Sequence, residues 1–146
     1  MKSHSKATIA LLGAAAIAAI TAVAHLSCIF FGPTCYEAQM APPQIIQSSI
    51  DGTLLAPIGT IFVSLLFLSC ALFAISGAGY IKKLPLLNKA LLCISVLCIL
   101  RGLMTIPLSF LFPEMVSSFS ITAGCTWFIA GSLYFYGYFN LRQSAS

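Results

Sequence analysis

Four long apolar runs, separated by short polar segments, predict helices at about 7–31, 54–80, 86–112 and 116–139. Each run is at least as long as the ~20 residues that an α-helix needs to cross a hydrocarbon core. The runs are continuous, whereas the strands of a membrane β-barrel alternate over ~10 residues. Helices are the expected spanning element because lipid offers the backbone no hydrogen-bond partners. The pattern therefore predicts an all-α integral membrane protein, folded as a four-helix bundle.

Composition and charge agree with a membrane environment. Of the 146 residues, 60% are hydrophobic and 7% are charged, against roughly 25% charged residues in a soluble domain. Because the apolar runs leave almost nothing for a separate soluble part, we expect a single transmembrane domain over 1–146. We interpret the net charge of +4 as a signal of orientation, and we expect no nucleic-acid partner.

The basic residues are distributed unevenly along the chain. Six of the seven lie in the tails or near the turn between the second and third runs: Lys2, Lys6, Lys82, Lys83, Lys89 and Arg142. Lys and Arg are retained on the cytoplasmic side of a membrane, which predicts that both termini and this turn are cytoplasmic. The outer loop 32–53 and the turn around Glu114 then face the opposite side. We expect the first run to stay as an uncleaved helix, with a signal peptide cleaved after Ala22-Val23-Ala24 as the alternative.

Small residues recur at helical spacing within the runs. Ala14, Ala18 and Ala22 share one face of the first helix, and Ser95, Cys98, Gly102, Thr105 and Ser109 share one face of the third. Such seams let helix backbones approach closely. We interpret them as packing surfaces within the bundle, with homodimer contacts, and therefore a homo-oligomer, as the alternative.

The outer loop contains a short amphipathic pattern at 44–50, in which Ile45, Ile46 and Ile50 are the apolar positions. One to two turns of helix with an apolar face suit a position against the bundle or in the membrane interface. We expect this helix to cap the bundle; a lid over the region of Arg101 is the alternative.

The cysteines and histidines restrict the chemistry. Of six cysteines, four lie inside the apolar runs, where Cys behaves as a small apolar residue. Cys28 and Cys35 flank the turn Gly32-Pro33 and form a candidate disulfide, with two free thiols as the alternative. His4, His25 and the few acidic residues supply no ligand set for zinc or haem and no catalytic constellation. We therefore expect no metal, no cofactor and no catalytic residue.

Arg101 is the one charged residue deep inside an apolar run, whereas Lys89 lies at the start of the same run, near the turn. A charged side chain at the membrane centre costs at least ~2.5 kcal/mol, so its position needs an explanation. Counting from Pro85 places Arg101 in the outer half of the membrane, at nearly the depth of His25. We predict an outward-facing polar cluster of Arg101 and His25 with one of the loop acids, Glu37 or Asp51. A structural arginine that is paired or extends to the headgroups is the alternative to a functional one.

Three segments, FGPTCYEAQMAPPQIIQSSIDGTLLAPIGT, SGAGYIKKLPLL and LRGLMTIP, resemble those of small four-helix bacterial inner-membrane proteins. The resemblance implies a location in the bacterial inner membrane and a loose link to envelope or ion homeostasis. We therefore expect a non-enzymatic membrane protein that acts through membrane lipids, ions or other membrane proteins. The alternative is a small transporter or channel with Arg101 in its pathway, and a membrane enzyme is a distant third.

Overall fold

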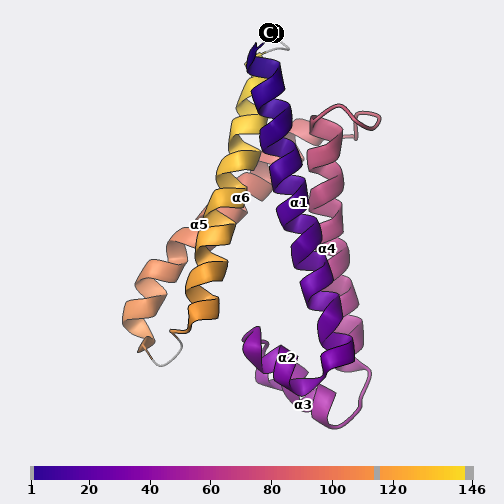
Figure 1. Ribbon diagram of the computed structural model, residues 1–146, viewed down its shortest axis with the longest axis vertical. Helices are drawn as coiled ribbons and strands as arrows, with labels where there is room; N and C mark the ends of the chain where they lie inside the picture. Colours follow the sequence, from indigo (N-terminus) through magenta and orange to yellow (C-terminus); the bar gives the residue numbers. More distant parts are fainter. Residues whose placement is uncertain (1, 114–115, 144–146) are drawn as a thin grey trace. The chain divides into compact units, whose positions relative to one another are not determined.

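The structure is a computed structural model that describes residues 2–113 and 116–143. These residues form α-helices and no strand (Figure 1), which confirms the all-α prediction. The helices are α1 (Lys2–Phe31), α2 (Pro33–Ala38), α3 (Pro43–Ile50), α4 (Leu55–Gly77), α5 (Leu87–Leu111) and α6 (Ser118–Gln143). Of the predicted turns, the one around Glu114 lies outside the described residues.

Three of the helices are long and apolar enough to cross a membrane. They are the segment Lys6–Phe31 of α1, all of α4 and all of α5. Helix α6 has 26 residues, or ~39 Å at ~1.5 Å per residue, but Ser, Thr, Gly and Tyr interrupt its apolar sequence. The three helices indicate a multi-pass membrane protein.

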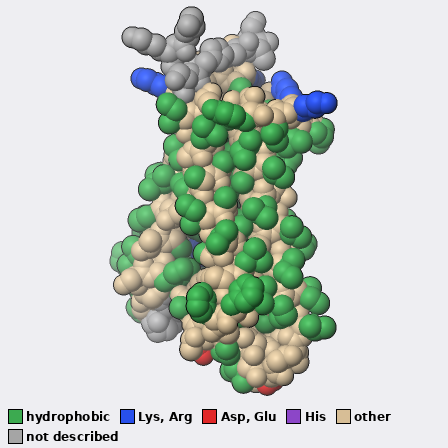
Figure 2. Space-filling model, turned by 45° about the vertical axis from the view of Figure 1, so that its right-hand side comes forward, with side chains coloured by type: hydrophobic (Ala, Val, Ile, Leu, Met, Phe, Trp, Pro, Cys, Tyr) green, Lys and Arg blue, Asp and Glu red, His purple; other side chains and the backbone are tan. Residues whose placement is uncertain are grey.

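Apolar side chains are spread over the visible surface of the helices (Figure 2). On α4, Ile58 and Phe62 keep 60% and 63% of their surface exposed. Extensive apolar patches are rare on soluble monomers, whereas lipid chains solvate such side chains without cost. The exposed apolar side chains therefore indicate a membrane environment, as the lengths of the helices do.

The chain packs as two compact units, each of which is described separately. The first unit comprises Met1–Ala18 and Cys70–Ser146, and the second comprises Ala19–Ser69. Helices α1 and α4 contribute residues to both.

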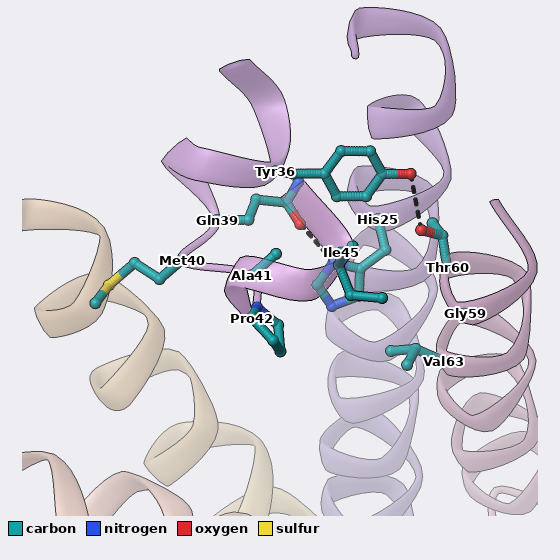
Figure 3. Close-up of a pocket in the computed structure, with 10 residues that line it drawn as sticks. All are labelled: His25, Tyr36, Gln39, Met40, Ala41, Pro42, Ile45, Gly59, Thr60 and Val63. Atoms are coloured by element: carbon teal, nitrogen blue, oxygen red, sulfur yellow. Dashed lines mark hydrogen bonds between the residues drawn. The ribbon is translucent and has the colours of Figure 1, made fainter. Parts of the chain in front are cut away.

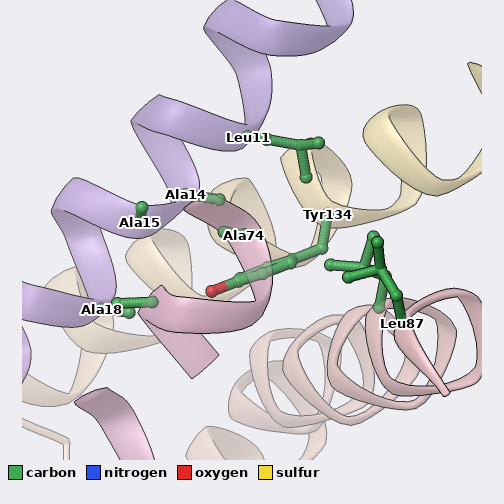
Figure 4. Packing of buried hydrophobic residues seen from close by; sticks show 9 residues of the cluster. Leu11, Ala14, Ala15, Ala18, Ala74, Leu87 and Tyr134 are labelled. Atoms are coloured by element: carbon green, nitrogen blue, oxygen red, sulfur yellow. The ribbon is translucent and has the colours of Figure 1, made fainter. Parts of the chain in front are cut away.

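The core of the first unit is built from small alanines around one tyrosine (Figure 4). Tyr134 of α6 is 1% exposed, and its hydroxyl donates a hydrogen bond of 3.0 Å to the carbonyl oxygen of Cys70. Ala14 and Ala18 of the predicted α1 seam pack into this core. The hydrogen bond matters because an unpaired hydroxyl in an apolar core costs roughly 1–3 kcal/mol.

Four helix ends meet at one end of the first unit. Residues from the start of α1, the end of α4, the start of α5 and the end of α6 pack in a single cluster that includes Leu11, Ala78, Leu87 and Leu141. Figure 2 shows Lys and Arg side chains gathered there. We call this end of the first unit its basic end.

Glycines bring α5 and α6 into close contact. A Cβ atom added to Gly131 would lie 2.7 Å from the backbone nitrogen of Ile99, and one added to Gly102 would lie 2.8 Å from the backbone nitrogen of Phe128. Only glycine fits at these two crossing points without moving a backbone. The small-residue seam predicted on the third helix therefore packs within the chain, against α6.

Candidate functional site

The second unit joins the end of α1 to the start of α4 through the two short helices α2 and α3. Gly32 has φ +74°, a left-handed conformation that glycine adopts without strain, and Pro33 occupies the first turn of α2. A disulfide links Cys28 of α1 to Cys35 of α2, with 5.1 Å between their Cα atoms. It attaches the α2–α3 segment (residues 33–50) to the end of α1.

Tyr36 connects the α2–α3 segment to α4. The side chain is 5% exposed, and its hydroxyl lies 2.9 Å from the hydroxyl of Thr60. Because Thr60 donates its own proton to the carbonyl oxygen of Ala56, Tyr36 is the donor in this pair. Ser48 of α3 adds a second connection, since its hydroxyl accepts a hydrogen bond of 2.8 Å from the backbone N–H of Ala56 near the start of α4.

His25 is held by a hydrogen bond and a ring contact. Its Nδ1 is hydrogen-bonded to the side-chain oxygen of Gln39, and its ring centroid lies 5.3 Å from that of Phe67. Gln39 is itself oriented, because its amide nitrogen donates to the carbonyl oxygen of Ala24 at 2.9 Å. The amide oxygen therefore faces the imidazole, and Nδ1 must carry the proton in this bond.

The two predicted loop acids lie in the second unit with His25, and both are exposed. Asp51 accepts a hydrogen bond of 2.8 Å from Gln47. Across the described residues, no hydrogen bond or ion pair joins His25 to Glu37 or Asp51. Arg101 belongs to the first unit, where its side chain on α5 is exposed. The cluster of Arg101, His25 and one acid stays a prediction.

A cavity of about 430 Å³ lies between α1, the α2–α3 segment and α4 (Figure 3). Its polar lining consists of His25, Tyr36, Gln39 and Thr60. The other lining residues are Met40, Ala41, Pro42, Ile45, Gly59 and Val63. The volume falls in the range of small-molecule sites, ~300–1,000 Å³. We take this cavity and the α2–α3 segment as the candidate site.

Sequence reasoning singled out His25 but missed Tyr36, Gln39 and Thr60. The available signal was Pro33 after Gly32, which marks the start of a helix. That helix places Tyr36 and Gln39 three residues apart, on neighbouring positions of one face.

Within the described residues, no group of three or more His, Cys, Asp or Glu side chains is arranged to hold a metal ion. No protein-family model, curated protein or solved structure matches this chain.

Proposed function

We propose that this chain is a non-enzymatic protein of the bacterial inner membrane that supports envelope or ion homeostasis. In this proposal α6 is a fourth span, the helices form a four-helix bundle, and both termini are cytoplasmic. The α2–α3 segment faces the opposite side and interacts with membrane lipids. Ions and other membrane proteins, including further copies of the chain, are the other partners in this class.

The basic end of the first unit supports this orientation. Lys6 begins the apolar part of α1, Lys82 and Lys83 lie in the turn after α4, and Lys89 and Arg142 lie near the start of α5 and the end of α6. Positive charges that gather at one end of a membrane unit are typical of its cytoplasmic side.

The disulfide supports the same orientation independently. Helix α1 is continuous from Lys2 to Phe31, so a spanning α1 has its two ends on opposite sides of the membrane. Cys28 and Cys35 lie at its second end. Disulfides persist in the periplasm and other oxidising compartments and are rare in the cytosol, which supports an outside position for this end.

The observation that carries the proposal is the attachment of the α2–α3 segment around a largely apolar cavity. A disulfide, the Tyr36–Thr60 hydrogen bond and the Ser48–Ala56 hydrogen bond hold the segment in place. A fixed segment with a cavity is suited to binding, because little conformational entropy is lost when a ligand binds to a preformed site.

A strain that lacks the gene tests this function when it is complemented with matched cysteine variants. Cys35→Ser breaks the disulfide, whereas Cys125→Ser changes an exposed free thiol on α6. We expect the deletion to raise detergent sensitivity or lower the membrane potential. Wild type and Cys125→Ser should restore whichever property the deletion changes, and Cys35→Ser should not. Wild-type detergent resistance and potential in the deletion strain would reject the proposed function.

Arg101 supports a second candidate, a small transporter or channel. Its side chain is exposed on α5, inside a segment that is able to span a membrane, and intramembrane charges commonly mark ion or substrate pathways. Ion flux through liposomes that contain the purified protein tests this candidate. Flux that is present in wild type and lost in Arg101→Ala supports it, and an absence of flux in wild type rejects it.

A further inference from the structure

We propose that the cavity at His25 binds a neutral lipid alcohol, whose hydroxyl donates a hydrogen bond to Nε2 of His25. The inference deepens the lipid interaction of the proposed function, and it rests on that function. Three properties of the cavity point to this class of ligand. They are the hydrogen-bonding state of its polar groups, the absence of charge in its lining, and its position along α1.

The existing hydrogen bonds use the donor hydrogens of three polar side chains in the lining. Tyr36 donates to Thr60, and Thr60 donates to Ala56. The amide nitrogen of Gln39 donates to Ala24 and contacts the Cys35 sulfur at 3.7 Å. These hydroxyl and amide hydrogens therefore already have acceptors within the protein.

His25 differs from these groups. Because Nδ1 carries the proton toward Gln39, the neutral imidazole has its lone pair on Nε2. Figure 3 shows this second ring nitrogen on the side of the ring turned away from Gln39. Within the part of the chain that the structure describes, no side chain or backbone group is hydrogen-bonded to Nε2. The polar side chains of the lining thus offer acceptors and no unused donor hydrogen, and Nε2 is the acceptor that has no hydrogen bond. This selects a ligand with a hydrogen-bond donor.

The lining excludes charged ligands on electrostatic grounds. None of the ten lining residues is Lys, Arg, Asp or Glu. Burial of an unpaired carboxylate, phosphate or ammonium in such a site costs far more than one hydrogen bond returns. Apolar walls such as Ile45 and Val63 favour a hydrocarbon body instead.

The position of His25 matches the depth of a lipid hydroxyl. His25 lies six residues before Phe31, or ~9 Å along the helix axis at ~1.5 Å per residue. If α1 spans the membrane, this depth is near the boundary between headgroups and acyl chains. On α4 the lining continues from Gly59 to Val63, one turn further from the start of the helix, where an acyl chain has room to follow.

The test uses the full-length protein in detergent and a photoreactive palmityl alcohol that carries a diazirine and an alkyne. Unlabelled palmityl alcohol and its methyl ether serve as matched competitors, because the ether keeps the chain and loses the donor. A hydrogen bond between neutral groups contributes ~0.5–1.5 kcal/mol, so the ether should compete about two- to twelvefold more weakly with wild type. The crosslinks should map to residues 39–63.

Two variants test the hydrogen-bond acceptor of His25 and the volume of the cavity separately. His25→Phe keeps an aromatic ring beside Phe67 but removes the acceptor, so alcohol and ether should become equally weak competitors. At Gly59 an added Cβ meets only Ile45, at 3.5 Å, so Gly59→Leu should fold and fill the cavity, with loss of labelling. Ile61→Leu, on the same helix and outside the lining, is the control with wild-type labelling.

Dipalmitoylglycerol as a third competitor distinguishes a membrane glyceride from a single-chain alcohol as the source of the hydroxyl. Equal competition by alcohol and ether on wild type overturns the inference without any variant, and so does wild-type labelling of Gly59→Leu. Either result leaves the proposed function standing, because the deletion strain and Cys35→Ser decide that function separately.

Discussion

The close contact between α5 and α6 gives a quantitative prediction for Gly131→Ala. The added Cβ would lie 2.7 Å from the backbone nitrogen of Ile99 and 2.9 Å from the carbonyl oxygen of Ser95. Backbone atoms do not rotate away as a side chain does, so the two helices must separate. Overpacking of this kind typically costs ~1–3 kcal/mol.

Gly13→Ala is the matched control within the same unit. Its Cβ would meet only Cδ1 of Leu133, at 3.5 Å, which is an ordinary van der Waals contact. Both substitutions replace a helical glycine and gain up to ~1 kcal/mol of helix propensity. Because that gain is common to both, the two variants should differ in unfolding free energy by the overpacking cost alone, ~1–3 kcal/mol.

Thermal unfolding in detergent measures this difference. The single tryptophan, Trp127, lies on α6 one turn before Gly131, and its fluorescence reports on the α5–α6 contact. With ~4 °C per kcal/mol for a chain of this size, Gly131→Ala should have a Tm ~4–12 °C below that of Gly13→Ala. Equal Tm values for the two variants would refute the packing of α5 against α6 through Gly131.

Three further predictions concern the α2–α3 segment and Arg101. Unreduced protein should resist maleimide at Cys28 and Cys35 and become reactive after reduction, and labelling of Cys35 without reductant would contradict the disulfide. Because the disulfide closes a short loop, its loss should lower the free energy of unfolding by ~2–3 kcal/mol. Tyr36→Phe should lower stability by ~1 kcal/mol, and a double-mutant cycle with Thr60→Val should show coupling, whereas additive effects would argue against the hydrogen bond. Because Arg101 is exposed, Arg101→Ala should change the unfolding free energy by less than ~0.5 kcal/mol, and a large loss in a detergent melt would indicate a paired arginine.

The spanning helices were predictable because membrane solvation imposes one requirement on the whole segment. A helix in lipid needs about 20 apolar residues, and such runs are visible without knowledge of any contact. The predicted range 54–80 extends past the end of α4 at Gly77, because Ala78 and Tyr80 are apolar enough to continue the run. The chain turns there instead, with Gly79 at φ +85°.

The details of the site were less predictable. The pattern at 44–50 indicated α3, because Ile45 and Ile46 pack against the buried cluster of Cys28, Tyr36 and Ala56. Helix α2 has six residues, too few for a periodic pattern, and it was missed. The partner of His25 was sought among acidic residues on the basis of charge, whereas Gln39, a neutral amide, provides the hydrogen bond. The distribution of charged residues does not reveal an uncharged hydrogen-bond partner, because its position depends on the exact path of a short loop.

Reporter fusions measure the orientation of the chain in the membrane. Alkaline phosphatase is active only in the periplasm, so we place it at the C-terminus and, in a second fusion, within 38–50. We expect an inactive enzyme at the C-terminus and an active one in the α2–α3 segment, with the opposite pattern for a fluorescent protein that matures in the cytoplasm. Active phosphatase at the C-terminus would contradict the four-span arrangement with both termini inside.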